Sequence, residues 1–358
     1  MSSNVSVSPF IVGPPVLDPA RFHGRRREVT DFFAVLRAPQ LVPVSVVGVA
    51  RSGKTSYLRH VSNDAIAQTE LLTLAQEGRP TIIAYADLGP VKELADLHER
   101  IVDAVRRSLP AQPASRAVNL VDKSSRSVDD FLSTVRAKSR LVILLDDFDT
   151  PSRFPWFADA LQWLRSLVDE RLVWVTATVH DIATGLCAQD VSSCASPFCG
   201  IFRPARIVLG ALDEEDCIEL ICGEAATALL VVSREEALAI RGLAGGLPYF
   251  IQEAAGLWLK CRTNGCDSRS LVECVPATCL ALRRSGVFDG VWRHLSTAQQ
   301  SLLESAALQD VPARGEQMTG EEAQLVRLGL LEELAGVIRP PGRALRQWLV
   351  HRDRVREE

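Results

Sequence analysis

The segment Gly48-Val49-Ala50-Arg51-Ser52-Gly53-Lys54-Thr55 constrains the fold of this chain more than any other. It has the pattern G-x-x-x-x-G-K-T, which is typical of a loop that surrounds phosphate groups. Pro43 to Val47 is a short apolar, β-branched run typical of a buried strand, and Thr55 to Val61 opens a helical pattern. Strand, glycine-rich loop and helix follow one another as a phosphate-binding loop requires.

Each part of this segment has a chemical reason. Its glycines allow backbone N–H groups to turn inward around an anion, and the helix that follows points its positive end toward the same place. Lys54 would add a full charge near the outer phosphates, and the Thr55 hydroxyl could hold Mg²⁺. The alternative is a chance glycine turn before a helix. We predict that the following residues bind the nucleotide, with Lys54 also catalytic: Gly48, Val49, Ala50, Arg51, Ser52, Gly53, Lys54, Thr55 and Ser56.

The composition is that of an ordinary globular protein large enough for two or three domains, with 358 residues, 47% of them hydrophobic and 23% charged. A net charge of −4 argues against a protein that binds nucleic acid with its whole surface, although a local basic face stays open. No apolar run approaches the ~18 residues that span a bilayer. Met1 to Pro9 lacks the features of a signal peptide. We therefore expect a cytoplasmic protein without a membrane partner.

The nine cysteines all lie beyond residue 180. An odd number without a signal peptide argues against a disulfide framework and favours structural or free thiols. Cys194 with Cys199, or Cys261 with Cys266, could be pairs of metal ligands. Neither pair has C-x-x-C spacing, however, and no histidine stands at zinc spacing nearby.

Short apolar runs alternate with helical patterns in the first two thirds of the chain, which predicts a parallel α/β sheet. Helical patterns include Val91 to Ser108 and Pro155 to Glu170. The expected strands are Pro43 to Gly48, Thr81 to Asp87, Leu141 to Asp146, Leu172 to Ala177 and Arg206 to Leu209.

After Leu212 the strand pattern stops and a helical pattern begins. From Val287 the order becomes helix, helix, short hairpin, helix, which suggests a winged-helix module. The expected domains are an extended segment at 1–20, a phosphate-loop α/β domain at 21–211, a helical lid at 212–284 and a winged helix at 285–358.

A second chemical signal is the apolar run from Arg140 that ends in adjacent carboxylates. In phosphate-loop enzymes a carboxylate at the end of a neighbouring strand helps to bind magnesium, and we assign this role to Asp146. Asp147 would orient or deprotonate the attacking water. The alternative is a strand that simply exits into an acidic loop.

Together these motifs resemble the STAND and AAA-like branch of phosphate-loop ATPases, over residues 21 to 350. Phe22-His23-Gly24-Arg25-Arg26-Arg27-Glu28 is similar to the F-x-G-R-x-x-E box of that branch, and Leu145 to Asp149 resembles the STAND acidic motif. Gly246-Leu247-Pro248 matches its G-x-P motif. The resemblance implies that Phe22, Gly24, Arg25 and Pro248 lie against the adenine. It also implies ATP and Mg²⁺ as cofactors, the sheet order 5-1-4-3-2, ATP binding between the α/β domain and the lid, and self-oligomerisation in the ATP state.

The family usually places a polar residue at the end of the next strand to sense the γ-phosphate. Thr176 is our candidate, with Thr178 second, and the alternative is a strand residue that satisfies a neighbour. Many STAND proteins carry an arginine just after this threonine, whereas this chain has Thr178 and Val179 there. Candidates for a trans-acting arginine, or else plain surface charges, are Arg203, Arg206, Arg283 and Arg284.

The C-terminal part is rich in arginine and could follow a phosphate backbone. Glutamates surround the helix that would enter a groove, and the resemblance implies a module that packs on the nucleotide domain as a switch. These arginines are Arg339, Arg343, Arg346, Arg352, Arg354 and Arg356, and the glutamates are Glu316, Glu321, Glu322, Glu332 and Glu333.

We therefore expect an ATP-binding molecular switch, hydrolysing ATP in a slow or regulated way, that controls the assembly of partner proteins. Sensor and effector would reside on other proteins, in trans, because about twenty residues precede the box and no repeat array follows the predicted winged helix. The alternatives are a DNA-associated ATPase of the origin-recognition or transposition-regulator kind, and a nucleotide-bound scaffold without hydrolysis.

Overall fold

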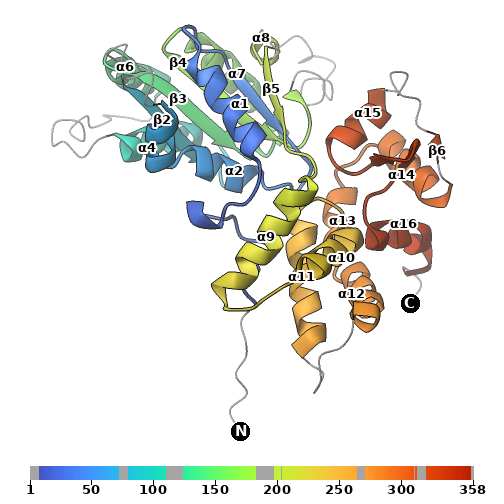
Figure 1. Ribbon diagram of the computed structural model, residues 1–358. Coiled ribbons are helices and arrows are strands. Elements are labelled where there is room, and N and C mark those ends of the chain that lie inside the picture. Colours follow the sequence, from blue (N-terminus) through green and yellow to red (C-terminus); the bar gives the residue numbers. More distant parts are fainter. Residues whose placement is uncertain are drawn as a thin grey trace. The chain divides into compact units, whose positions relative to one another are not determined.

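The computed structural model describes residues 8–71, 80–109, 124–182, 197–202, 204–263, 271–309, 311–312 and 320–355 (Figure 1). The chain forms two compact units. The sheet unit comprises Arg26–Gly48 and Lys54–Val208. The helical unit comprises Met1–Arg25, Val49–Gly53 and Leu209–Glu358.

The sheet unit contains a five-stranded parallel sheet in the order β2-β3-β4-β1-β5, so the predicted fold class and strand order are confirmed. Every residue of β1 and β4 is buried, as expected for parallel strands covered on both faces. The strands are β1 (Val44–Val47), β2 (Thr81–Asp87), β3 (Arg140–Asp146), β4 (Leu172–Thr178) and β5 (Ala205–Val208).

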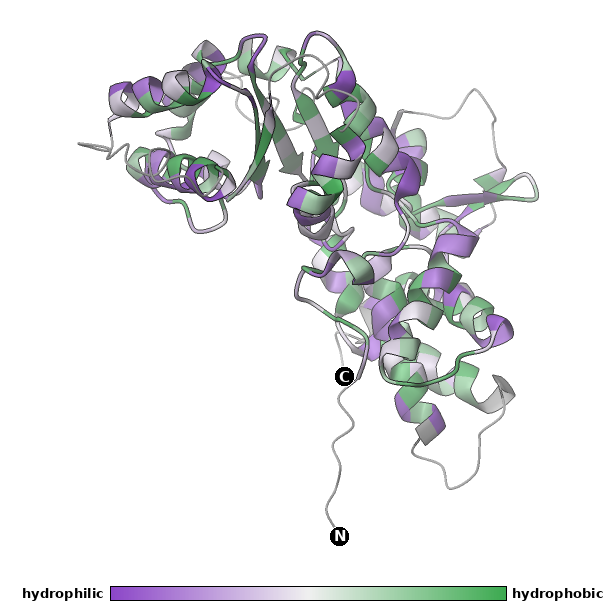
Figure 2. Cartoon of the chain, turned by 60° about the vertical axis from the view of Figure 1, so that its left-hand side comes forward, coloured by the Kyte–Doolittle hydropathy of each residue, from purple (hydrophilic) through white to green (hydrophobic). Residues whose placement is uncertain are grey.

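Amphipathic helices cover both faces of this sheet. Their apolar sides face inward while charged residues lie outside, so the ribbons change between green and purple in Figure 2. The helical segments are α1 (Arg26–Arg37), α2 (Lys54–Val61), α3 (Asp64–Leu71), α4 (Leu94–Ser108), α6 (Ser125–Arg136), η3 (Pro151–Arg153), α7 (Phe157–Ser166) and α8 (Pro197–Gly200).

One face of the sheet packs on α4, α6 and α7 in a single apolar cluster that includes Leu145 and Trp174. Trp174 is fully buried, and its Nε1 atom donates a 2.7 Å hydrogen bond to the carbonyl of Leu164. Elsewhere in the sheet unit, Phe32 of α1 packs edge-to-face against Tyr57 of α2. Because all five strands are parallel, their carboxyl ends meet at one edge, which is where the acidic residues of β2 and β3 lie.

The helical unit joins a bundle to a small antiparallel sheet of order β6-β8-β7. Asp213 caps α9 by accepting a hydrogen bond from the N–H of Asp216. The helices are η1 (Pro19–Arg21), α9 (Glu214–Thr227), α10 (Arg234–Ala244), α11 (Pro248–Thr263), α12 (Leu271–Arg284), α13 (Val287–Trp292), α14 (Thr297–Leu308), α15 (Gly320–Arg327) and α16 (Arg343–Val355). The strands are β6 (Val311–Pro312), β7 (Glu332–Leu334) and β8 (Val337–Arg339).

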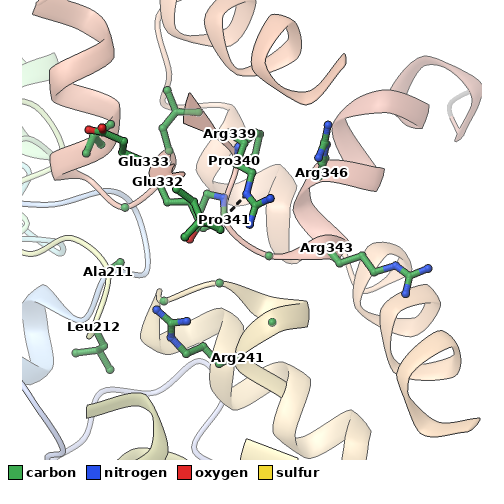
Figure 3. A pocket seen from close by; sticks show the side chains of 18 of the residues that line it. Ala211, Leu212, Arg241, Glu332, Glu333, Arg339, Pro340, Pro341, Arg343 and Arg346 are labelled. Carbon is green, nitrogen blue, oxygen red and sulfur yellow. Dashed lines mark hydrogen bonds and ion pairs between the residues drawn. The ribbon is translucent and has the colours of Figure 1, made fainter. Parts of the chain in front are cut away.

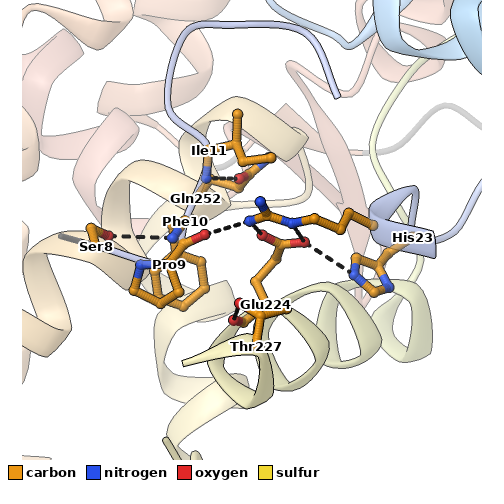
Figure 4. A network of polar contacts seen from close by, with 9 residues as sticks. Ser8, Pro9, Phe10, Ile11, His23, Glu224, Thr227 and Gln252 are labelled. Atoms are coloured by element: carbon orange, nitrogen blue, oxygen red, sulfur yellow. Dashed lines mark hydrogen bonds and ion pairs between the residues drawn. The ribbon is translucent and has the colours of Figure 1, made fainter. Parts of the chain in front are cut away.

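A polar network fixes the N-terminal segment of the helical unit to α9 (Figure 4). The buried carboxylate of Glu224 accepts hydrogen bonds from both Nε and Nη2 of Arg21, and it lies 3.3 Å from Nε2 of His23. Arg21 also donates to the carbonyl of Pro9 at 2.6 Å, and the N–H of Ile11 donates to Gln252 at 2.7 Å. Residues 9–23 are therefore tied to the bundle by charge and hydrogen bonds.

The expectation of structural or free thiols holds at Cys217, Cys222, Cys261, Cys274 and Cys279, which are not disulfide-bonded. It is wrong at Cys199, which is disulfide-bonded. The other cysteines named as possible metal ligands, Cys194 and Cys266, lie outside the described residues. Within the described ranges, no helix has the length and apolar character needed to cross a bilayer.

Candidate functional site

The glycine-rich loop connects β1 to α2, as its sequence predicts. The backbone of Arg51 and of Gly53 is left-handed, with φ of 69° and 93°. A Cβ atom at Gly53 would meet nothing within 4 Å, so this glycine is needed for its backbone angle rather than for space. Ser52 donates its N–H to the Val49 carbonyl at 3.1 Å, which closes a tight turn before α2.

Lys54 is the first residue of α2 and is buried in the sheet unit. Its Nζ atom donates a 2.8 Å hydrogen bond to the carbonyl of Gly48, at the start of the loop. Burial lowers the pKa of the ammonium group, and the charges of Asp149, Asp146 and Asp147 counteract part of this effect. Three carboxylates thus act on the side chain predicted to contact the outer phosphates.

Asp146 ends β3 and is 1% exposed. Its Oδ2 atom accepts a 2.7 Å hydrogen bond from the hydroxyl of Tyr85, and its Oδ1 atom accepts the N–H of Asp147 at 3.0 Å. The guanidinium of Arg59 lies 3.7 Å from the centre of the Tyr85 ring. Burial, followed by the charge of Asp146, raises the pKa of the Tyr85 phenol, so this group stays a hydrogen-bond donor.

Sequence reasoning missed Tyr85 and Arg59. The signal for Tyr85 was its position two residues before Asp87 in a strand that also ends in a carboxylate. Since β2 pairs in parallel with β3 so that Asp87 lies opposite Asp146, Tyr85 must face the same side of the sheet as Asp146.

Asp147 follows Asp146 with a left-handed backbone, φ 50°, and its side chain reaches the surface. Partial desolvation, followed by the charge of Asp146, raises the pKa of its carboxyl to about 6, although Lys54 acts in the opposite direction. Asp149 has a structural role, since its Oδ2 atom accepts the N–H of Val179 at 3.0 Å, just after β4. The acidic edge therefore combines one rigid buried carboxylate with one that titrates near neutrality.

Thr176 and Thr178 occupy different positions at this edge. Thr176 lies opposite Leu145, so its side chain is on the core face of the sheet, and the side chain of Thr178, two residues later, is on that face too, whereas Asp146 is on the other face. The carbonyl of Thr178 accepts the N–H of Gly48 at 3.2 Å, which puts this residue beside the start of the loop. Both hydroxyls are buried without a hydrogen-bond partner among the described residues. Position at the edge favours Thr178 over Thr176.

The box residues Gly24 and Arg25 lie in the helical unit, and both have left-handed backbones, φ 73° and 62°. The N–H of Arg25 donates to the Asp216 carboxylate at 3.2 Å. Its buried guanidinium donates to the carbonyls of Gly210 and, at 3.4 Å, Ser52. Arg25 thereby links the box to the tip of the glycine-rich loop by hydrogen bonds to the backbone.

The G-x-P motif approaches the same loop tip. Pro248 is the first residue of α11, a position that suits its fixed φ and missing N–H. The guanidinium of Arg51 lies 4.8 Å from the ring centre of the adjacent Tyr249. Phe22 and Pro248, the two residues expected against adenine, are both partly buried. Within the helical unit, the structure therefore brings the box, the loop tip and the G-x-P motif together.

Several predicted charges have other roles. Arg206 forms a 2.6 Å ion pair with Asp181, and Arg203 lies outside the described residues. Arg352 stacks 4.0 Å from the ring centre of Trp292, and Arg346 donates to the Ala307 carbonyl, so both contribute to packing of the C-terminal helices. Nothing is described of the side chains of Arg354, Arg356 and Glu316.

Solved structures of other proteins share this fold. A Walker-type ATPase of Pyrococcus abyssi superimposes with a TM-score of 0.56 at 13% identity, over 94% of this chain and 98% of that chain. The ORC2 protein of Aeropyrum pernix, solved in ADPNP–ADP complexes, superimposes with a TM-score of 0.53 at 15% identity, over 97% and 96%. This chain shares their fold. No protein-family profile and no curated protein matches the sequence.

Proposed function

We propose that this protein binds ATP with Mg²⁺ and hydrolyses it as a molecular switch that controls the assembly of partner proteins. The observation that carries the proposal is Lys54, a buried ammonium group directly after a glycine-rich loop, with Asp146, Asp147 and Asp149 acting on it. A buried cation beside carboxylates suits a ligand that brings both negative charge and a metal ion.

The donor set fits Mg-ATP. The loop supplies backbone N–H groups and the buried hydroxyl of Ser52, which has no hydrogen-bond partner in the described part of the chain, and α2 begins at the end of the loop. Among the described side chains, no group of three or more His, Cys, Asp or Glu could cage a metal. This is the pattern expected for magnesium, which is usually held by one or two protein oxygens together with phosphates and water. Thr55 and Asp146 would be those protein ligands.

In this proposal each motif has one task. The loop and Lys54 neutralise the phosphates, and bound Mg²⁺ adds charge neutralisation at the reacting phosphate. Asp147 accepts a proton from water, since a base with a pKa near 6 is largely ionised at neutral pH but still basic enough to act. Thr178 supplies the hydroxyl that senses the outer phosphate, and Phe22, Gly24, Arg25 and Pro248 hold the base.

Calorimetry tests the binding step. Wild-type protein is expected to bind Mg-ATP, and Lys54→Ala to abolish the heat. Lys138→Ala is the matched control, because Lys138 is an exposed lysine just before β3, at the amino edge of the same sheet. Absence of heat from the wild type at millimolar Mg-ATP, or equal loss in both variants, would contradict the proposal.

Phosphate release distinguishes an enzyme from a scaffold. Asp147→Asn is expected to keep ATP binding and lose turnover, while Asp130→Asn, an exposed aspartate of α6, keeps both. Asparagine tolerates the left-handed backbone at position 147, so the fold should survive. Tight binding by the wild type with no turnover would favour the scaffold alternative, which the missing arginine after Thr176 already suggests.

The switch itself is tested by partner capture. The contacts that differ between nucleotide states are expected at the Phe22–Arg25 box and at Gly246–Pro248. ATP and ADP should therefore yield different sets of captured proteins, and ATP should also promote self-association in sedimentation. The same set and the same mass in both states would count against a switch.

A DNA-associated ATPase is the second candidate, supported by the helices and small sheet at residues 297–355, which we interpret as a winged helix. Fewer basic side chains are accessible there than the sequence suggests, because the side chain of Arg352 is 17% exposed and stacks on Trp292. A labelled duplex that is not retarded even at low salt would exclude this candidate.

A further inference from the structure

The helical unit contains a pocket of about 740 Å³ that the proposed ATP site does not use (Figure 3). Its walls come from three stretches that are distant in the sequence. One is the segment Ala211 to Glu214, another is the end of α10 with the turn up to Gly246, and the third runs from the end of α15 through the hairpin to the start of α16. The volume lies in the range of pockets that enclose small-molecule ligands.

Close backbone contacts hold these walls together. A Cβ atom on Gly342, whose φ is 77°, would lie 2.4 Å from the backbone nitrogen of Gly245. One on Gly329 would lie 2.4 Å from the backbone nitrogen of Ala211. Only glycine permits such approaches, so close main-chain contacts hold the wall segments against one another.

Seven of the residues that line the pocket are charged. Arg241 comes from α10, whereas the other basic side chains come from β8 and α16. The pocket is lined by four arginines and three glutamates, which leaves one net positive charge: Arg241, Arg339, Arg343 and Arg346 against Glu214, Glu332 and Glu333.

Two of the arginines keep hydrogen-bonding capacity. Nη1 of Arg241 is 3.7 Å from the nearest carboxylate oxygen, on Glu214, which is too far for a hydrogen bond. Its Nε atom is buried without a hydrogen-bond partner among the described residues, and its guanidinium also interacts with the thiol of Cys217, which does not line the pocket. Arg343, the first residue of α16, is exposed and makes no ion pair within the described part of the chain. Arg339, by contrast, lies 3.3 Å from Glu332.

We propose that this pocket binds a phosphate monoester of a small molecule that carries hydroxyl or amino groups. A guanidinium matches two phosphate oxygens at once, and the start of α16 adds N–H donors on the same wall. A monoester carries about −1.5 to −2 charges, which suits a lining with one net positive charge and four arginines. The negative charge of a triphosphate would be poorly compensated by the one net positive charge of this pocket. Glu333 and Glu332 can accept the ligand's hydroxyl or amino hydrogens.

The test is calorimetry of the full-length chain with glucose 6-phosphate and with AMP, using glucose as the probe without phosphate. At least one phosphate probe is expected to bind, more weakly at high salt, while glucose gives no heat. Arg241→Gln and Arg343→Gln should each weaken binding about tenfold or more, since each removes a charge-assisted hydrogen bond. Arg262→Gln is the matched control, because Arg262 pairs with Glu236 at 3.2 Å and neither residue lines the pocket.

Three results would overturn the proposal. One is no heat from either phosphate probe at millimolar concentration. A second is equal weakening by Arg262→Gln, which would indicate general charge attraction. The third is loss of binding in Lys54→Ala, which would place the probe on the glycine-rich loop instead. Arg343→Gln keeps the test valid if Arg241→Gln does not fold, because Arg343 is exposed. Binding that persists in Lys54→Ala would support the pocket even if the proposed ATPase function fails.

Discussion

The hydroxyl of Tyr85 donates a 2.7 Å hydrogen bond to Oδ2 of Asp146, so a tyrosine from the neighbouring strand orients the carboxylate that we assign to magnesium. Tyr85→Phe removes only this bond and keeps the ring under Arg59. We expect the free energy of unfolding to fall by about 1.5–3 kcal/mol, the range for a hydrogen bond to a charged group. Affinity for Mg-ATP should fall more than affinity for metal-free ATP.

Tyr57→Phe is the control for this change. Tyr57 donates a bond of similar length, 2.8 Å, but to the neutral carbonyl of Glu28. Its removal should cost about 1 kcal/mol and leave the magnesium dependence of nucleotide binding unchanged. Urea unfolding and calorimetry with and without Mg²⁺ measure both effects. Equal behaviour of the two variants would mean that Tyr85 has no special relation to the metal ligand.

The pKa of Asp147, raised to about 6, makes a prediction about stability and pH. A carboxyl whose pKa is higher in the folded state than in the unfolded state stabilises the fold while it is protonated. This stabilisation is complete at pH values below the unfolded-state pKa, near 3.8. That contribution is lost as the pH rises through about 6. Asp147→Asn should therefore raise the urea midpoint at pH 7.5 and have little effect at pH 4.

Asp130→Asn, at an exposed position of α6, should shift the midpoint little at either pH. The same titration should appear in catalysis if Asp147 is the base, as ATP turnover that declines below about pH 6. An Asp147→Asn variant whose midpoint follows the wild type across the whole pH range would refute the assigned shift.

The sheet could be predicted in detail from the sequence because its strands are short apolar runs that end at polar residues such as Asp87 and Asp146. The loop was predictable for a similar reason, since its glycines and Lys54 have fixed spacing. The tie from Tyr85 to Asp146 was not, because a tyrosine in a buried strand is usually a core residue, and only the register of β2 on β3 brings the two together.

Other features depend on contacts between distant segments. The pocket proposed to bind a phosphate monoester is lined by Arg241 and by residues after position 338, and no local sequence pattern predicts that these residues line one pocket. The preference for Thr178 over Thr176 follows from the hydrogen bond between the Gly48 N–H and the Thr178 carbonyl, which requires knowing that β1 and β4 are neighbours in register. The disulfide at Cys199 was not predicted, because the argument from the number of cysteines applies to the chain as a whole and not to a single position.

Gly24 and Gly286 form a matched pair, because both have φ of 73° but different surroundings. Alanine at either position should cost about 1 kcal/mol for the left-handed backbone. At Gly24 the added Cβ would also lie 2.8–2.9 Å from the side chain of Asp216, which accepts the N–H of Arg25, whereas at Gly286 its nearest neighbour is 3.8 Å away. Gly24→Ala should therefore be clearly the less stable variant in urea.

The same pair tests the adenine box. Displacement of Asp216 by Gly24→Ala would release the Arg25 backbone, so ATP affinity should fall, while Gly286→Ala should bind ATP like the wild type. Fluorescence titration with a labelled ATP analogue measures this difference. Unchanged affinity in a folded Gly24→Ala protein would remove the box from the nucleotide site.

Glu224 links the N-terminal segment to α9 through Arg21 and His23. Burial alone would raise the pKa of this carboxyl, but the hydrogen bonds from His23 and Arg21 outweigh it and lower the pKa. A depressed pKa contributes stability that is present above the unfolded value, near 4.5, and is lost as the pH falls through the lower folded value. Glu224→Gln should therefore lower the free energy of unfolding by about 1.5–3 kcal/mol at pH 7, and this difference from the wild type should shrink in acid.

Glu215→Gln is the control, because it breaks the exposed pair with Arg234 and should have little effect at any pH. Limited proteolysis at pH 7 supplies a local readout, since residues 9–23 should become susceptible in Glu224→Gln but not in Glu215→Gln. Equal protection in both variants would show that the network does not hold the N-terminal segment.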